Sequence, residues 1–330
     1  VYLTEDCNLR NSYCFVAKKK RSMSAEVARK TVDFFLSPQV SGSERDLQIN
    51  FFGGEPLLEV DRMEEILRRT REMATRSGRR VDYSVTTNGT LFSERIAALV
   101  REFDVALLYS LDGGPSVTGE DRPFVSGRSS HDLVVKNLPR FLEASQGRLM
   151  VRTTFHPAAL RLVERVEYLL SLGAPSISLC PVVDANWEPF EAAIEEEYDR
   201  LADWFLERCR AGELPPLELT WLLVRQWQWA HLGGPRPARP CPVGHSLMAV
   251  DPDGNVLPCH RFLYRRQDWL GTLDQSDLAG RQRFVALHSS QMAPDCDSCP
   301  ARPVCGGGCR LVALQRGLEL TATYSGYCIP

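Results

Sequence analysis

The chain has 330 residues, of which 44% are hydrophobic and 25% charged, as in ordinary globular proteins. Its 39 basic and 42 acidic residues leave a formal charge of −3, which argues against nucleic acid or an anionic membrane as a partner. No apolar run approaches the ~18 residues of a membrane-spanning helix, and no signal peptide is visible. Because the chain opens within an expected strand, we expect further residues upstream of Val1.

The first part of the chain, up to about residue 185, alternates expected strands with expected helices. Six short apolar segments are predicted as strands: residues 1–4, 47–52, 81–87, 105–111, 149–155 and 176–183. Helical stretches lie between them, for example at 60–77 and 132–145. This alternation predicts an α/β fold with parallel strands and outer helices, and six such units make a partial (β/α)6, TIM-like barrel. Functional loops are expected at the carboxyl ends of its strands.

After the sixth strand, the sequence predicts a change of organisation. Apolar residues spaced by three and four over 190–209 predict a long amphipathic helix. A Gly/Pro-rich stretch at 233–240 breaks regular structure and marks a boundary. The predicted domains are therefore a barrel over 1–215, a bridging helix and linker over 216–240, and a small cysteine-rich domain over 241–330. In this last domain we expect bound metal to form the core.

Seven of the eleven cysteines fall into one ordered spacing in the last third of the chain: Cys241, Cys259, Cys296, Cys299, Cys305, Cys309 and Cys328. Thiolates at short intervals, separated by Gly and Pro, can surround a metal without straining the backbone. Seven is too many for one zinc and one short of two four-thiolate sites, so the pattern favours two iron–sulfur clusters over two zinc sites. Disulfides are disfavoured because the rest of the chain is typical of a cytosolic enzyme. Outside the pattern, Cys180 and Cys209 are predicted to be small buried apolar side chains.

Four short motifs each lie at the carboxyl end of an expected strand, in chain order. They are Cys7-x3-Asn11-x2-Cys14-Phe15, Gly53-Gly54-Glu55-Pro56, Thr86-Thr87-Asn88-Gly89 and Ser110-Leu111-Asp112-Gly113. With them the chain resembles the radical S-adenosylmethionine (SAM) superfamily, whose signature loop is CxxxCxxC followed by an aromatic residue. The seven C-terminal cysteines resemble the SPASM extension of its peptide-modifying members. The resemblance implies a 4Fe–4S cluster with one iron open for SAM, whose C–S bond breaks on electron transfer to release a 5′-deoxyadenosyl radical.

The resemblance also implies cofactor contacts at the barrel rim. The predicted cofactor-binding residues are Tyr13, Phe15, Gly53, Gly54, Glu55, Asn88, Ser110 and Arg152. The two glycines would let the backbone approach the methionine amino group of SAM. Ribose or carboxylate contacts at 88 and 110 compete with ordinary turn roles, and a carboxylate contact at 152 competes with a structural ion pair. The two aromatic residues would flank the adenine or wall the loop.

One position departs from the signature: the middle cysteine of the loop is Asn11. An amide oxygen is a hard, neutral ligand, poorly suited to iron in a thiolate cluster. We therefore expect Cys7 and Cys14 to hold a 4Fe–4S cluster weakly, and this form of the chain to turn over SAM poorly. Three explanations stay open: a disabled variant, a degenerate homologue, or a site completed in another way.

For the C-terminal cysteines, the SPASM resemblance implies a crossed pairing into two auxiliary clusters. The cluster nearer the barrel would be held by Cys241, Cys259 and Cys309. The distal cluster would be held by Cys296, Cys299, Cys305 and Cys328. The nearer cluster would then keep an open iron, available to a substrate thiolate or an outside ligand.

The residue after Cys259 bears on the type of reaction. Sulfatase-maturing relatives carry an Asp there as proton acceptor, whereas this chain has His260. The run Pro258-Cys259-His260-x-Phe262 resembles maturases that form thioethers in ribosomal peptides, of the SCIFF, sactipeptide and ranthipeptide types. His260 is then a candidate acid/base or supporting group, with a structural role as the alternative. Formylglycine generation, a non-catalytic homologue that binds peptide or carries electrons, and a zinc-stabilised interaction domain also stay open.

The implied partners follow from this chemistry. They are a ribosomally made precursor peptide and an electron donor such as flavodoxin or ferredoxin, with no nucleic acid and no membrane. Because reduced iron–sulfur sites survive only in reducing surroundings, a cytoplasmic location is expected.

Overall fold

The computed structural model describes residues 1–41, 46–218, 241–275, 278–287 and 309–315. These belong to two compact units. The first comprises Val1–Leu111, Thr118–Met150 and Val243–Leu287, and the second Asp112–Val117, Val151–Pro242 and His288–Pro330. The domain boundaries expected at 215 and 240 stay predictions, because residues 219–240 lie outside the described ones.

Six strands follow chain order in one sheet, β1-β2-β3-β4-β5-β6. Their bounds are β1 (Tyr2–Thr4), β2 (Leu47–Gly53), β3 (Val81–Thr87), β4 (Ala106–Ser110), β5 (Leu149–Phe155) and β6 (Ile177–Pro181). The pairs β1–β2, β2–β3, β3–β4 and β5–β6 are all parallel. This confirms the predicted α/β fold with a parallel sheet, and chain-order parallel strands are consistent with a partial barrel.

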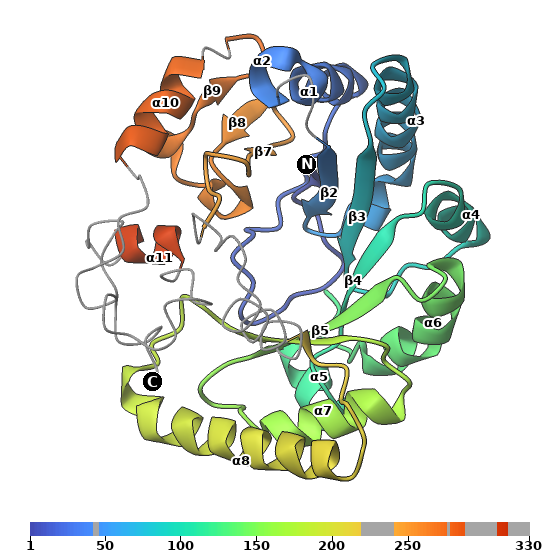
Figure 1. Ribbon diagram of the computed structural model, residues 1–330, viewed down its shortest axis with the longest axis vertical. Helices are drawn as coiled ribbons and strands as arrows, with labels where there is room; N and C mark the ends of the chain where they lie inside the picture. Colours follow the sequence, from blue (N-terminus) through green and yellow to red (C-terminus); the bar gives the residue numbers. More distant parts are fainter. Residues whose placement is uncertain (42–45, 219–240, 276–277, 288–308, 316–330) are drawn as a thin grey trace. The chain divides into compact units, whose positions relative to one another are not determined.

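Helices alternate with these strands. Their bounds are α1 (Ala25–Leu36), α2 (Pro38–Ser41), η1 (Pro56–Glu59), α3 (Val60–Arg76), α4 (Glu94–Glu102), α5 (Pro115–Asp121), α6 (His131–Ala144), α7 (Leu162–Ser171), η2 (Glu188–Phe190) and α8 (Glu191–Arg210). Figure 1 shows α1, α3, α4 and α6 along the outer side of the first unit's strands. In α3 the buried side chains Met63, Ile66, Leu67, Thr70 and Ala74 follow the three-and-four spacing of one helical face.

The predicted elements agree closely with those observed. The strands expected at 81–87 and 149–155 have those bounds, and the other four differ by one or two residues at their ends. The long helix expected at 190–209 is α8, Glu191–Arg210. Among the described residues, no helix is both long enough and apolar enough to cross a membrane.

A small antiparallel sheet lies in the first unit. Its strands are β7 (Ala249–Val250), β8 (Asn255–Leu257) and β9 (Gly271–Thr272), followed by η3 (His260–Phe262), η4 (Arg266–Asp268) and α10 (Leu278–Leu287) in this part of the chain. Val250, Leu257 and Phe262 are fully buried, and the Phe262 ring meets Phe284 edge-on at 5.6 Å between centroids. Apolar side chains thus form a core in this segment, and the expectation that bound metal forms the core of residues 241–330 stays a prediction.

This small sheet packs on the N-terminal helices of the same unit (Figure 1, orange beside blue). Lys30 of α1 pairs with Asp274 at 2.8 Å, and Arg281 of α10 donates to the Val40 carbonyl oxygen at 3.0 Å. The segment that carries Cys259 is thereby fixed to the part of the chain that carries Cys7 and Cys14.

The second unit joins β6, α7 and α8. The Glu197 carboxylate of α8 accepts the Leu162 backbone N–H at 2.7 Å, which satisfies a donor at the start of α7. Trp187 packs edge-on against Phe155 of β5, with 5.8 Å between ring centroids. A short helix, α11 (Arg310–Gln315), buries Val312 and Ala313 against Val183 and Cys309.

Candidate functional site

Two residues separate the end of β1 from Cys7, the first residue of the signature loop. Cys7 is buried, and its Sγ accepts the Leu9 backbone N–H at 3.4 Å and an Asn88 amide N–H at 3.7 Å. Burial raises the pKa of the Cys7 thiol, and the hydrogen bond from Leu9 opposes that shift. The loop thus holds one thiol in a fixed position with two N–H groups aimed at its sulfur.

Asn11 occupies the middle position of the loop. The Asn11 Oδ1 atom is buried and has no hydrogen-bond partner among the described residues. The Asn11 carbonyl oxygen accepts the Cys14 N–H at 3.3 Å and the Lys18 ammonium at 3.4 Å. Burial lowers the pKa of Lys18, and the nearby Cys14 and Cys7 thiolates oppose that shift.

The donor set of this loop does not fit the cluster that the signature implies. A three-thiolate site needs a sulfur at position 11, and the chain offers a neutral amide oxygen there. A buried amide oxygen without a donor also costs on the order of 1–3 kcal/mol. The loop therefore supplies two thiols, Cys7 and Cys14, and we derive no reaction step through a cluster held by them.

The glycine motif at the end of β2 lies against the start of the signature loop. Gly53 has a φ of +146°, and a Cβ added there would lie 2.1 Å from the Thr4 carbonyl oxygen. A Cβ at Gly54 would lie 2.0 Å from the Asp6 carbonyl oxygen. The Gly54 N–H donates to Thr4 and the Glu55 N–H to Asp6, at 2.9 and 2.8 Å. Close approach to the backbone of Thr4 and Asp6 explains both glycines, and their predicted contact with SAM stays a prediction.

Glu55 links the ends of β2 and β3. Its fully buried carboxylate accepts the Asn88 N–H at 2.7 Å, the Thr87 hydroxyl at 2.9 Å and the Leu57 N–H at 3.0 Å. Burial raises the pKa of Glu55 to about 7, and these three donors oppose the shift. The glutamate of the motif therefore organises the edge of the sheet around Cys7.

The Asn88 side chain forms hydrogen bonds with neighbouring residues of the protein. Its amide donates to the Asn8 side chain at 2.8 Å and to Cys7 Sγ, while its Oδ1 accepts from the backbone and hydroxyl of Thr90 at 3.0 and 2.7 Å. This is the turn role that the sequence left open, with an added contact to the thiol. Ser110, the last residue of β4, is half-buried at the same edge.

The two aromatic residues of the signature loop lie in different surroundings. The Tyr13 hydroxyl accepts a hydrogen bond from the Arg122 guanidinium at 3.1 Å. Phe15 stacks with Phe52 at 6.2 Å between centroids and an interplanar angle of 17°. The His260 ring lies 4.8 Å from that of Phe52 and 6.1 Å from that of Phe15. The structure thus brings Phe15 and His260 together, next to Cys14 and Cys259 in the chain.

In the second unit, Arg152 of β5 faces β6. Its guanidinium donates to the Cys180 sulfur at 2.6 Å, and both side chains are half-buried. Cys180 was predicted to be a small buried apolar side chain, but it is half-buried with a polar partner, and Cys209, predicted likewise, is also half-buried. A polar partner for Arg152 within the protein agrees with the structural alternative, and its carboxylate contact stays a prediction.

Sequence reasoning missed Arg165, which fixes the Ser-Leu-Asp-Gly turn. This side chain is 2% exposed and donates to the backbone carbonyl oxygens of Asp112, Ala159 and Leu160. Asp112 Oδ1 in turn accepts the Thr154 N–H at 2.9 Å. The sequence does carry one signal for this residue, an arginine on the apolar face of α7. A guanidinium buried there needs hydrogen-bond acceptors.

The C-terminal cysteines are described in part. Cys259 is buried, and Cys241 and Cys309 are half-buried. Cys296, Cys299, Cys305 and Cys328 lie outside the described residues. Within the described ranges, no group of three or more His, Cys, Asp or Glu side chains is placed to hold a metal. The predicted auxiliary clusters stay predictions.

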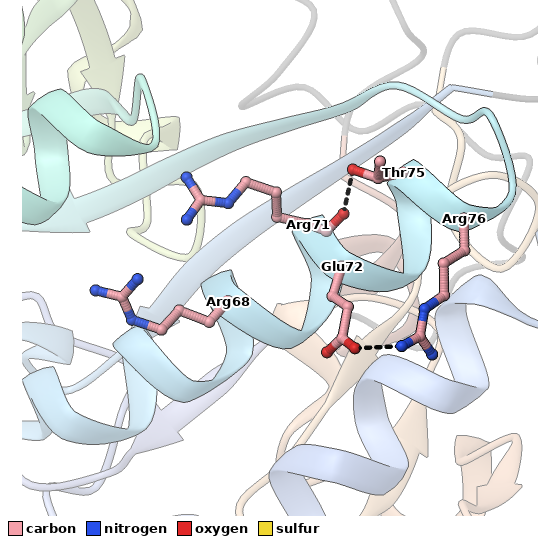
Figure 2. A pocket seen from close by; sticks show the side chains of 5 residues that line it. All are labelled: Arg68, Arg71, Glu72, Thr75 and Arg76. Atoms are coloured by element: carbon pink, nitrogen blue, oxygen red, sulfur yellow. Dashed lines mark hydrogen bonds and ion pairs between the residues drawn. The ribbon is translucent and has the colours of Figure 1, made fainter.

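A surface depression on α3 lies apart from this edge of the sheet. It is lined by Arg68, Arg71, Glu72, Thr75 and Arg76 (Figure 2). Arg76 pairs with Glu72 at 2.6 Å, and Arg68 and Arg71 both pair with Glu102. Since these cations are neutralised by neighbouring carboxylates on exposed helices, the depression is not the candidate site.

Comparison with known proteins identifies the family. The model of the Radical SAM superfamily matches residues 1–196, more than half of the chain. The chain belongs to the radical SAM superfamily. An uncharacterized protein of Methanocaldococcus jannaschii is 27% identical over 187 residues, which cover 53% of this chain and 59% of that relative.

Two further likenesses extend over nearly the whole radical SAM chain. A cysteine-type anaerobic sulfatase-maturating enzyme of Clostridium novyi is 22% identical over 328 residues, covering 93% of this chain and 86% of its own. The structure described as native anSMEcpe with bound AdoMet and Kp18Cys peptide matches with a TM-score of 0.77 at 19% identity, covering 99% of this chain and 93% of its own. At that identity the likeness shows a common fold.

Proposed function

We propose that this radical SAM protein modifies a ribosomally made precursor peptide by installing a cross-link, a thioether or a similar bond. The observation that carries the proposal is the common fold with anSMEcpe, described with AdoMet and a peptide bound, over 99% of the chain. His260 in place of the aspartate of sulfatase-maturing enzymes favours cross-linking over formylglycine generation. Cofactors would be SAM and 4Fe–4S clusters, and partners the peptide and an electron donor.

The C-terminal cysteines support this proposal through their spacing. Seven thiols over Cys241–Cys328 match the SPASM arrangement of peptide-modifying members and would hold two auxiliary clusters. Such clusters take up electrons when a C–H and an S–H bond are replaced by one C–S bond. The Phe15 and His260 rings lie 6.1 Å apart, so the segments of Cys14 and Cys259 are close to each other in the first unit.

The second part of the proposal is that the chain with Asn11 turns over SAM poorly. The buried, unpartnered Asn11 Oδ1 supports this, since a thiolate at that place would face iron and an amide oxygen cannot replace its bonding. The same observation favours a second candidate, a non-catalytic homologue that binds peptide or carries electrons.

Co-expression tests the reaction directly. The Asn11→Cys chain would be produced with short cysteine-bearing precursors from neighbouring reading frames, and the peptides analysed by mass spectrometry. The proposal predicts loss of two hydrogens for each cross-link with Asn11→Cys, and none with Asn11→Ala. Exchange of a peptide thiol for an aldehyde would instead establish sulfatase-type maturation. Unmodified peptide that co-purifies with an iron-loaded Asn11→Cys chain would establish the binding homologue.

A further inference from the structure

A short hairpin of the first unit is hydrogen-bonded along the signature loop. It comprises residues 121–130, which begin at the last residue of α5, and we call it the strap. Pro123 and Ser129 form an antiparallel bridge within it, and the Phe124 N–H donates to the Arg128 carbonyl oxygen at 2.8 Å. The two arms of the strap are thus bonded to each other.

The strap is joined to the signature loop through the main chain. Three hydrogen bonds connect them: Arg10 N–H to the Pro123 oxygen at 2.8 Å, Ser12 N–H to the Asp121 oxygen at 3.0 Å, and Val125 N–H to the Asn8 oxygen at 3.1 Å. Between these bonds, the fully buried Leu9 forms an antiparallel bridge with Phe124. Alternate residues of the loop are therefore held as in an antiparallel ladder, so the protein's own backbone fixes the course of the loop.

Side chains reinforce this ladder at its ends. The Ser12 hydroxyl donates to the Asp121 carboxylate at 3.0 Å, and the Arg122 guanidinium donates to the Tyr13 hydroxyl at 3.1 Å. The Arg122 carbonyl oxygen accepts the Ser130 hydroxyl at 2.6 Å, which ties the two ends of the strap together. Since hydrogen bonds with an ionised partner are the stronger ones, the two contacts to the loop add to its hold.

Cys7 is the thiol whose surroundings depend on the strap. It is 7% exposed, whereas Cys14, which follows the bonded residues 8–13, is half-buried. The bonds to the strap begin at the residue directly after Cys7. Because Cys7 Sγ accepts the Leu9 N–H at 3.4 Å, the position of this sulfur follows the backbone that the strap holds.

The strap is exposed on its outer side. Residues 125–129 are all exposed, and Val125 is 61% exposed. Segments with an exposed, hydrogen-bonded backbone and few buried apolar side chains open locally at a lower free energy than the core does. The strap is therefore poised to open while the parallel sheet stays folded.

We propose that the strap is the gate of the signature loop. Closed, it fixes residues 8–13 and encloses the Cys7 thiol, and its local opening admits thiol-seeking ligands, soft electrophiles or thiophilic metal ions, to that sulfur. The gate goes beyond the proposed function and does not depend on it, because access to a thiol is measured without SAM, iron or peptide.

Two glycines of the first unit provide matched variants. Gly127, in the turn of the strap, and Gly147, after α6, each have a φ of +81°, and a Cβ added to either would meet no atom within 4 Å. Gly127→Ala and Gly147→Ala therefore strain the backbone alike, and only the first strains the strap. Labelling of the full chain with iodoacetamide, followed by peptide mapping, gives the rate at Cys7. We expect Gly127→Ala to raise this rate about fivefold or more, and Gly147→Ala less than about twofold.

A milder variant and a second measurement support this comparison. Ser12→Ala keeps the three main-chain bonds and loses the side-chain bond to Asp121, so we expect the Cys7 rate to rise about two- to fivefold. In hydrogen exchange of the unaltered chain, the amides of Arg10, Ser12 and Val125 should exchange together, at least about tenfold faster than those of β3. Thermal unfolding of the two glycine variants checks that both lose similar stability.

Two results would overturn the gate. One is an equal Cys7 labelling rate in the two glycine variants, which would mean that the thiol is reached through global unfolding. The other is exchange of the amides bonded to the strap no faster than that of β3. Should Gly127→Ala not fold, Ser12→Ala decides, and an unchanged Cys7 rate in that variant rejects the proposal.

Discussion

Glu55 shows how a single buried residue couples the motifs of the site. Its carboxylate receives donors from β3 and from its own turn, while its backbone N–H is bonded to Asp6 before Cys7. Because burial outweighs the three donors, the pKa of Glu55 rises from 4.5 to about 7. The folded chain therefore binds a proton at this residue more tightly than the unfolded chain does.

The sign of the pH dependence follows from that shift. The contribution of Glu55 is fully present below about pH 4.5 and is lost as the pH rises through about 7, a change on the order of 3 kcal/mol in the free energy of unfolding. Glu55→Gln should remove this part of the pH dependence, and should also cost about 1–3 kcal/mol because the Asn88 N–H loses its acceptor. Urea unfolding between pH 5 and 8 measures both. Parallel pH profiles for the two proteins would contradict the assignment.

The sequence motifs predicted which residues lie at the candidate site. They did not predict which atoms of the protein those residues contact. The motif placed Gly53, Gly54 and Asn88 at the sheet edge, but the structure was needed to show that the glycines approach β1 and that Asn88 binds Cys7. Arg165 was missed because no motif includes it. Its four backbone acceptors come together only in the folded chain.

At the scale of elements, Arg21 ties the N-terminal segment to the small antiparallel sheet. Its guanidinium contacts Glu5, Asp251 at 3.1 Å and Asp253 at 2.6 Å. The side chains of Glu5 and Asp251 are 1% and 0% exposed, so this single cation compensates two buried carboxylates. Arg21 thereby links the segment before Cys7 with the hairpin that precedes Cys259.

Loss of Arg21 should therefore be costly. Arg21→Leu leaves two buried carboxylates without their cation, which we expect to lower the free energy of unfolding by about 3–5 kcal/mol. Arg29→Leu is the control, because Arg29 is half exposed and only approaches Glu65 at 3.5 Å, and we expect less than about 1 kcal/mol there. Urea unfolding gives the two values, and hydrogen exchange over 249–257 should quicken in Arg21→Leu alone. Equal losses in both variants would contradict this role.

The elements differed in how far sequence predicted them. Alternating apolar segments of five to seven residues, separated by amphipathic helices, predicted β2 to β6 because each buries its own periodic face. The strands β7, β8 and β9 have only two or three residues each, which is too short for a period to emerge. Their core forms from side chains of the turns as well, such as Phe262 and Leu263.

At the scale of the whole molecule, the order of the four motifs predicts the fold and the family. The proposed chemistry depends on the cysteine thiolates that would hold the clusters. The superfamily match ends at residue 196, and the seven spaced cysteines lie beyond it, between Cys241 and Cys328. Four of those seven thiols lie outside the described residues, and the crossed pairing stays a prediction.

With Asn11, the signature loop lacks one of the three thiolates that the cluster needs. The most direct measurement is iron and sulfide per chain after anaerobic reconstitution, in the Asn11 protein and in Asn11→Cys, with 5′-deoxyadenosine release from SAM as second readout. We predict about four more irons per chain in Asn11→Cys, and SAM cleavage by that variant alone. Equal iron and equal SAM cleavage in the two proteins would contradict the account.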